Sequence, residues 1–169
     1  STNTSGTITS SVQANQAAGF SIITYTGTGT NATVGHGLSA APDMIWFKRR
    51  SGAAQNWKVY HSATGATKVF TLNTDSAQET VSGMFNNTEP TSTVFSIGNE
   101  SNTNTSTADH IAYAWHSVEG YSKFDFYEGN SNADGPYVYT GFRPRLLFVK
   151  LVFNSGSIRI KPLNEFLFC

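Results

Sequence analysis

The stretch DMIWFKRR at residues 43–50 decides the fold class of this 169-residue chain. It begins directly after Pro42, opens with large apolar and aromatic residues, and ends at the turn Ser51-Gly52. A short apolar run with these boundaries predicts a strand. About ten segments read as strands in this way, at residues 20–25, 43–50, 57–61, 68–72, 93–97, 110–116, 122–127, 137–139, 145–152 and 157–160.

The connections between these segments indicate the architecture. They are rich in Gly, Asn and Ser, and no segment leads into the 3.6-residue apolar period of a long helix. Residues 13–18 are the best helix candidate, but the pattern stops at Gly19, and we interpret it as a short helix or a turn. The chain is therefore predicted to be all-β, an antiparallel β-sandwich of the jelly-roll or concanavalin-like kind.

The polar stretches indicate one domain preceded by an arm. Residues 1–18 are predicted to be a polar N-terminal arm, and residues 19–169 a single β-sandwich domain. The tract ESNTNTST at residues 100–107 has little to bury and is expected to be an exposed loop. Residues 1–7 contain neither a basic nor an apolar region, so no secretory signal is expected there.

Charge and composition narrow the classes of partner. Only 13% of the residues are charged, and 11 basic side chains balance 11 acidic ones. A neutral chain has no long-range field to attract a phosphate backbone, so nucleic acid is not an expected partner. The chain contains no apolar stretch of about 20 residues, so no membrane-spanning helix is expected. The single Cys169 excludes an internal disulfide framework.

An internal repeat of about 102 residues runs through the sequence. Each copy has a glycine-started strand, a loop, and then a proline that leads into an apolar strand ending in lysine. The repeat predicts two units, which start near residues 19 and 120. The matching pieces are GFS at 19–21 with GYS at 120–122, Pro42 with Pro144, and IWFK at 45–48 with LFVK at 147–150.

No constellation of residues points to catalysis. His36 lies in the glycine-flanked turn VGHGL, where its backbone role is expected to dominate. His110 and His116 share one face of a predicted strand, but six residues separate them by about 20 Å, too far for two ligands of one metal. No pair of carboxylates stands out as an acid and a nucleophile, although such pairs need not be close in sequence. We therefore expect no enzyme activity and no catalytic residue.

One loop is a candidate for binding Ca²⁺. Asp125, Glu128 and Asp134 lie close together in sequence, and the loop EGNSNADG at residues 128–135 offers oxygen ligands at alternate positions. Glu128 and Asp134 are the candidate ligands. Asn and Asp side chains that bond to their own backbone in turns explain the same residues without an ion. The expectation is that no cofactor is needed.

Aromatic residues offer a second kind of site. Sugars stack on exposed rings while Asn and Asp side chains bind their hydroxyl groups. Tyr137 and Tyr139, just after the Gly135-Pro136 turn, are the strongest candidates for an exposed pair, and Trp57 and Asn132 complete a hypothetical glycan site. The alternative is that the rings fill the core of a sandwich that is poor in charge. Other rings that strand alternation could place outward are Trp46, Trp115, Tyr60 and Tyr127.

Several of these segments resemble a β-rich domain of tail-fibre and other structural proteins of marine tailed phages. The resemblance covers about residues 19–150, and the chain departs from the pattern after Lys150. The family has no catalytic motif to transfer; the resemblance implies a virion component exposed on the particle, sometimes with a glycan-binding role. The segments that carry it are GFSIITYTG at 19–27, GHGL at 35–38, WKVYH at 57–61, FNN at 85–87, STVFSIG at 92–98, VEGYSKF at 118–124, YEGN at 127–130 and GPYVYTGFRP at 135–144.

These features predict a non-enzymatic phage structural protein, part of a tail fibre or a decoration of the head or tail. The expected partners are further copies of the chain, as a homo-oligomer and most simply a trimer, together with other virion proteins. The alternative is a carbohydrate-binding adhesin or lectin module that recognises glycans on the host surface. The apolar end FLFC at residues 166–169 is expected to need a core or a neighbouring subunit to cover it.

Overall fold

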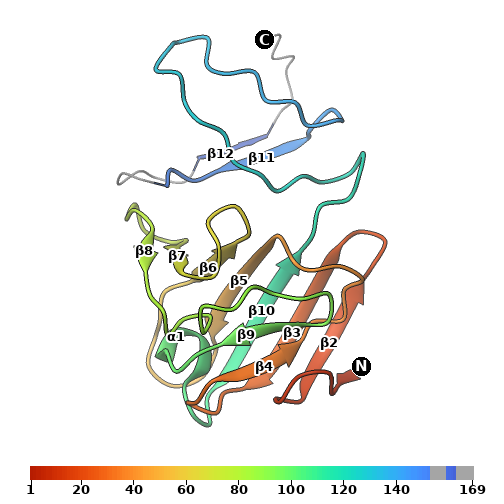
Figure 1. Ribbon diagram of the computed structural model, residues 1–169, viewed down its shortest axis with the longest axis vertical. Coiled ribbons are helices and arrows are strands. Elements are labelled where there is room, and N and C mark those ends of the chain that lie inside the picture. Colours follow the sequence, from red (N-terminus) through yellow and green to blue (C-terminus); the bar gives the residue numbers. More distant parts are fainter. Residues whose placement is uncertain (153–158, 163–169) are drawn as a thin grey trace.

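The central strand of the structure is β10 (Asp109–Trp115). In the computed structural model, which describes residues 1–152 and 159–162, β10 pairs antiparallel with β3 (Phe20–Thr26) on one side and with β5 (Met44–Arg49) on the other. Further strands extend both sides to the order β1-β2-β3-β10-β5-β6-β7-β8 (Figure 1). These outer strands are β1 (Thr2–Asn3), β2 (Ser10–Asn15), β6 (Lys58–His61), β7 (Lys68–Thr71) and β8 (Glu79–Thr80).

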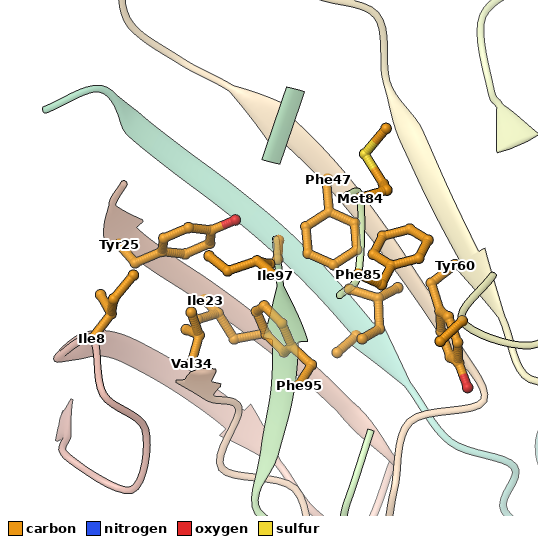
Figure 2. Packing of buried hydrophobic residues seen from close by; sticks show 14 of the residues in the cluster. Ile8, Ile23, Tyr25, Val34, Phe47, Tyr60, Met84, Phe85, Phe95 and Ile97 are labelled. Atoms are coloured by element: carbon orange, nitrogen blue, oxygen red, sulfur yellow. The ribbon is translucent and has the colours of Figure 1, made fainter. Parts of the chain in front are cut away.

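A smaller second layer covers one face of this sheet. It consists of the antiparallel pair β4 (Ala32–Gly35) and β9 (Val94–Ile97) with the single-turn helix α1 (Ser101–Asn104), as Figure 1 shows. The main core lies between the layers (Figure 2) and includes Phe47, Phe95 and Ile97. The structure thus confirms the predicted all-β antiparallel sandwich. We call the covered face of the large sheet the inner face and the opposite one the outer face.

Strand alternation explains which residues enter the core. On β10, Ala112 and Ala114 point to the inner face and are fully buried, while Tyr113 and Trp115 point to the outer face and are half-buried. The register places Ala112 opposite Phe47 of β5. A small residue beside a large ring lets the two layers approach closely without an empty space.

The prediction of an arm at residues 1–18 is wrong, because these residues belong to the sheet. Thr2 pairs with Ser11, and β2 pairs with β3 along its length. Ile8 and Val12 are buried in the main core. The helix-or-turn candidate at 13–18 is likewise the end of β2 followed by the turn to β3. The sequence of β2 is hard to identify as a strand because one of its faces is solvent-exposed and carries polar residues.

The prediction that residues 100–107 form an exposed loop is wrong at its centre. Thr103 and Asn104 are fully buried within the single turn of α1. The Asn104 carboxamide donates to the Thr30 and Gly98 carbonyl oxygens, both at 2.6 Å, and accepts from the Thr28 amide at 2.7 Å. A polar tract can therefore be buried when backbone groups satisfy its side chains.

Two predicted strands are absent after Trp115. Residues 122–127 and 137–139 form no ladder; only the single bridge Val118–Ser122 is present. The prediction at 145–152 is confirmed as β11 (Leu146–Val149), which pairs antiparallel with β12 (Arg159–Pro162). The prediction at 157–160 overlaps β12, and its residues 157–158, like the end at 166–169, lie outside the described residues. Residues 121–151 are called the C-terminal segment below.

Candidate interaction surface

A group of rings lies on the outer face of the large sheet. Phe20, Tyr113 and Trp115 come from β3 and β10, Trp46 comes from β5, and Trp57 precedes β6. We call these five residues the aromatic face. All five are half-buried, so parts of the rings remain accessible.

The rings of the aromatic face contact one another across three strands. Ring centroids lie 5.0 Å apart for Trp46 and Trp115, 5.2 Å for Phe20 and Trp115, and 6.1 Å for Trp57 and Tyr113. These distances fall in the range of attractive aromatic pairs. The Lys48 ammonium lies 5.6 Å from the centre of the Trp57 ring, a cation–π contact that adds positive charge to this face.

Amide side chains border the aromatic face on the β2 side. Asn15 is opposite Phe20 and Gln13 is opposite Ile22 in the β2–β3 ladder, and both amide residues are exposed. Cross-strand partners share one face of a sheet, so these amides lie beside the rings. Rings bordered by amides can bind a ligand that has both apolar faces and hydroxyl groups.

The C-terminal segment contacts one end of the aromatic face. The Phe124 ring lies 6.5 Å from Trp115, and the Phe148 ring lies 5.5 Å from Trp46. The Lys150 ammonium donates to the Thr74 carbonyl oxygen at 2.8 Å. These contacts attach the segment to the sandwich, with β11 and β12 beyond the upper end of the large sheet in Figure 1.

Most of the C-terminal segment's apolar surface is uncovered. Among the residues that the structure describes, every exposed large apolar side chain lies between positions 121 and 151. A concentration of exposed apolar side chains in one part of a chain is typical of an interaction site. The side chains are Tyr121, Phe126, Tyr127, Tyr137, Val138, Tyr139, Leu146, Leu147 and Leu151.

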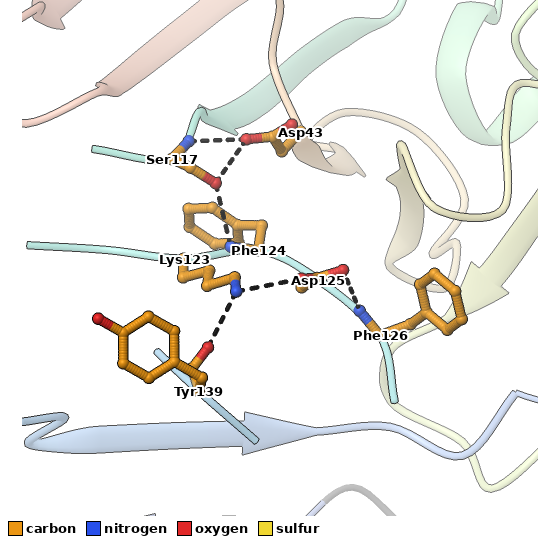
Figure 3. Close-up of polar contacts among 7 residues, drawn as sticks. All are labelled: Asp43, Ser117, Lys123, Phe124, Asp125, Phe126 and Tyr139. Carbon is orange, nitrogen blue, oxygen red and sulfur yellow. Dashed lines mark hydrogen bonds and ion pairs between the residues drawn. The ribbon is translucent and has the colours of Figure 1, made fainter. Parts of the chain in front are cut away.

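A short polar network fixes the start of this segment (Figure 3). Asp43 accepts hydrogen bonds from the Ser117 amide at 2.7 Å and the Ser117 hydroxyl at 2.8 Å, and the Ser117 hydroxyl oxygen accepts from the Phe124 amide at 3.2 Å. Lys123 forms an ion pair with Asp125 at 3.4 Å. The hydrogen bond from the Phe126 amide, together with Lys123, holds the pKa of Asp125 below its usual range.

The family of the chain is established by its sequence. A family profile described as a domain of unknown function, DUF7483, matches residues 1–160. The chain belongs to the DUF7483 family. The match includes both the sandwich and the β11 strand of the C-terminal segment. No curated protein and no solved structure gives a match to this DUF7483 chain.

The predicted glycan residues of this DUF7483 domain do not share one element. Tyr137 and Tyr139 belong to the C-terminal segment and are 74% and 69% exposed. Trp57 belongs instead to the aromatic face, next to Tyr113. Asn132 is exposed, and its side-chain oxygen accepts from the Asp134 amide at 3.1 Å, a local turn contact. Of the predicted rings, Tyr60 faces the inner core.

The Ca²⁺ candidates lie in the same exposed loop. Glu128 and Asp134 are both exposed, and the loop is shaped by Asn130 and Asn132 side chains that bond to backbone amides two residues further on. Within the described residues, no three His, Cys, Asp or Glu side chains gather where they could hold a metal ion. No helix in that part of the chain has the length and apolar character needed to cross a membrane.

Sequence reasoning missed two members of the aromatic face, Phe20 and Tyr113. The signal was present at residues 110–116, where alanines alternate with rings, because that pattern places the rings on one face of a strand. Their grouping with Trp46 depends on β10 lying between β3 and β5. That neighbour order cannot be read from any single segment.

Proposed function

We propose that this DUF7483 chain is a non-enzymatic structural subunit of a phage virion, in a tail fibre or a surface decoration of the head or tail. The observation that carries the proposal is the concentration of exposed apolar side chains in the C-terminal segment, beside a sandwich whose own large apolar residues are buried or half-buried. A surface of this kind supports contact with further copies of the chain and with other virion proteins. The resemblance of residues 19–150 to phage tail-fibre domains supports the virion setting.

Light scattering of the full chain across a range of concentrations tests self-assembly. We expect a homo-oligomer, most simply a trimer of the 18.3 kDa chain. The double variant Tyr121→Ser/Phe126→Ser should lower the mass because both side chains are exposed and apolar. The matched control Tyr121→Phe/Phe126→Tyr keeps the rings and should keep the oligomer. A monomer at every concentration would overturn the assembly proposal.

The virion location needs a test of its own. An antibody raised against the chain should label purified particles of the phage that encodes it, seen by electron microscopy at a fibre or on the particle surface. The same antibody incubated with the free chain first is the control for specific labelling. Particles that contain none of the chain by mass spectrometry would refute the location.

A carbohydrate-binding role is the second candidate, and two observations favour it. Tyr137 and Tyr139 are among the most exposed rings of the described chain, and the aromatic face carries the amides Asn15 and Gln13 at its border. A glycan array tests it with the variants Tyr137→Ala, Tyr139→Ala and Trp57→Ala. Tyr121→Ala, also at an exposed ring, is the control. Silence of the wild-type chain across the array would reject this candidate.

A further inference from the structure

A polar recess lies on the outer face of the large sheet, at the end where β10 begins. Its volume is about 400 Å³, which is within the range of ligand pockets. β10 runs from this end towards the C-terminal segment, so the recess is at the lower end of the sheet in Figure 1. The polar side chains that line it include Thr9, Ser11, Thr24, Thr26, Arg50 and Asp109.

Strand register brings the lining residues together. Ser11 is opposite Thr24 in the β2–β3 ladder, and Thr26 is opposite Asp109 in the β3–β10 ladder. Thr24 and Thr26 alternate on β3 with Tyr25, which is buried in the main core, so both threonines point to the outer face. Cross-strand partners share one face of a sheet, so Ser11 and Asp109 lie on that face too.

One cation and one anion lie together in the recess. The Arg50 amide donates to the Asp109 carbonyl oxygen at 2.7 Å, so the two residues are neighbours. Their side chains form no ion pair within the part of the chain that the structure describes. The Asp109 carboxylate accepts a hydrogen bond from the Thr26 hydroxyl at 3.3 Å. Because the two charges balance, the recess is complementary to a neutral ligand rather than to an ion.

Most hydrogen-bonding groups of the recess are not used by the protein. Within residues 1–152 and 159–162, the lining side chains without a hydrogen-bond partner are those of Thr9, Ser11, Thr24 and Arg50. A hydroxyl group both donates and accepts, a guanidinium group only donates, and a carboxylate only accepts. The lining therefore fits a ligand that presents several donors and acceptors close together, as the hydroxyl groups of a sugar do.

The aromatic face begins next to the recess on the same face of the sheet. Along β10, Asp109, Ile111 and Tyr113 occupy successive outer positions, so Tyr113 lies about 14 Å along the strand from Asp109. Ile111 is opposite Thr24 on one side and opposite Lys48 on the other. The outer face thus changes from hydroxyl groups to rings along β3 and β10, the two kinds of surface that bind a sugar.

We propose that this recess binds a neutral saccharide. The sugar hydroxyl groups donate to the Asp109 carboxylate and accept from the Arg50 guanidinium, while the Ser11 and Thr24 hydroxyls donate or accept. This inference rests on the carbohydrate-binding role given above as the second candidate, and it adds a site and a charge class of ligand to that role.

Titration calorimetry of the full chain with four hexasaccharides tests the class of ligand. The neutral probes are maltohexaose, cellohexaose and the hexamer of N-acetylglucosamine, and the acidic probe is hexagalacturonate, which has a carboxylate on every ring. We expect at least one neutral probe to bind, and to bind more tightly than hexagalacturonate. Tighter binding of hexagalacturonate than of every neutral probe, or binding of no probe, would overturn the proposal.

Two substitutions test whether the bound probe occupies the recess. Arg50→Met removes the donors but keeps the length of the side chain, and Asp109→Asn removes the charge but keeps an acceptor for the Thr26 hydroxyl. Each should lower the affinity about tenfold, because it removes charge-assisted hydrogen bonds. The matched controls Arg145→Met and Asp75→Asn, at exposed residues outside the recess, should leave the affinity unchanged. Unchanged affinity in both recess variants, or equal losses in the controls, would overturn the proposal.

The outcome is separate from the test of the carbohydrate-binding role. A chain that binds a glycan on the array, with an affinity that Arg50→Met and Asp109→Asn do not change, retains that role and loses the recess site. A chain that binds neither the array nor any hexasaccharide loses both, and its proposed structural role still depends on light scattering.

Discussion

Residues 45–48 (IWFK) of the sandwich and residues 147–150 (LFVK) of the C-terminal segment are similar in sequence but differ in burial. The apolar residues of β5 lie in two cores, whereas Leu146 and Leu147 of β11 are exposed and Phe148 and Val149 are half-buried. Within residues 1–152 and 159–162, β5 has strands on both sides, whereas β11 pairs with β12 alone. Burial in a sheet is therefore decided by the strand that comes next to a segment as much as by the segment itself.

Two glycines 102 residues apart, Gly27 and Gly129, also differ in how closely the chain packs around them. A Cβ at Gly27 would lie 2.2 Å from the Thr105 carbonyl oxygen, but a Cβ at Gly129 would meet nothing within 4 Å. In the sandwich the chain at such a turn is packed against another segment; in the C-terminal segment the turn is open. The two regions can thus be compared by matched substitutions.

The largest expected effect is at a core ring. Phe47 is 1% exposed and contacts Phe85 and Phe95 at centroid distances of 5.4 and 5.3 Å, so Phe47→Ala should lower the free energy of unfolding by about 4 kcal/mol. Phe126 is 63% exposed, and Phe126→Ala should change it by less than about 0.5 kcal/mol. Urea unfolding followed by Trp fluorescence measures both. Equal losses would contradict the division into a covered and an uncovered region.

The next effect concerns the paired glycines Gly19 and Gly120. Both have left-handed backbones, with φ of +61° and +72°. A Cβ at Gly19 would lie 2.6 Å from the His116 carbonyl oxygen, whereas at Gly120 the space is empty. Gly19→Ala therefore adds a clash to the backbone strain and should cost about 3 kcal/mol. Gly120→Ala carries the backbone strain alone, about 1 kcal/mol. Thermal unfolding of the two variants measures the two losses of stability. A greater loss for Gly120→Ala than for Gly19→Ala would contradict this prediction.

A smaller effect is expected at a buried amide. Asn104→Ala removes the partners of the Thr30 and Gly98 carbonyl oxygens and of the Thr28 amide, and should cost about 2 kcal/mol. Asn130→Ala removes one exposed turn contact, to the Asn132 amide, and should be nearly neutral. Urea midpoints of the two variants test this. An Asn104→Ala protein as stable as Asn130→Ala would mean that water replaces the lost contacts.

The fold class and many of the sandwich strands could be predicted from sequence because their signal is local. Residues 43–50 and 110–116 contain enough β-branched and aromatic residues to be predicted as strands. β2 could not be found because its exposed face is polar. The burial of Thr103 and Asn104 could not be predicted because their side chains bond to backbone carbonyl oxygens of other segments, those of Met84 and Thr30. The false strand at 122–127 has the opposite cause: its pattern fits a strand, but no partner lies beside it.

The candidate surface was predictable only in part, for the same reason. Tyr137 and Tyr139 could be found because they follow the Gly135-Pro136 turn. The aromatic face could not be assembled, because Phe20, Trp46 and Tyr113 meet only through the order β3-β10-β5. A sheet brings together residues whose separation in sequence carries no signal.

The smallest effect is a pH dependence that belongs to the sandwich alone. All four histidines lie at or before residue 116. His36 is fully buried; its Nδ1 accepts from the Leu38 amide at 3.1 Å, which leaves Nε2 to donate to the Thr91 carbonyl oxygen at 3.1 Å. Burial lowers the pKa of His36 below its usual value near 6.5, and protonation of Nδ1 would break the hydrogen bond from Leu38.

The sign follows from this lowered pKa. As the pH falls below about 6.5, His36 becomes protonated in the unfolded chain but stays neutral in the folded chain. The free energy of unfolding therefore decreases. The loss is at most about 1.4 kcal/mol per pH unit for each such histidine. His36→Asn keeps an acceptor for the Leu38 amide but cannot titrate, so it should lower stability at pH 8 and flatten the slope between pH 8 and 5. Urea midpoints across that range measure both. Amide hydrogen exchange in the C-terminal segment, corrected for the intrinsic effect of pH on exchange, should stay constant over this range. If the urea midpoints of the wild type and of His36→Asn change with pH at the same slope, His36 is not the titrating group.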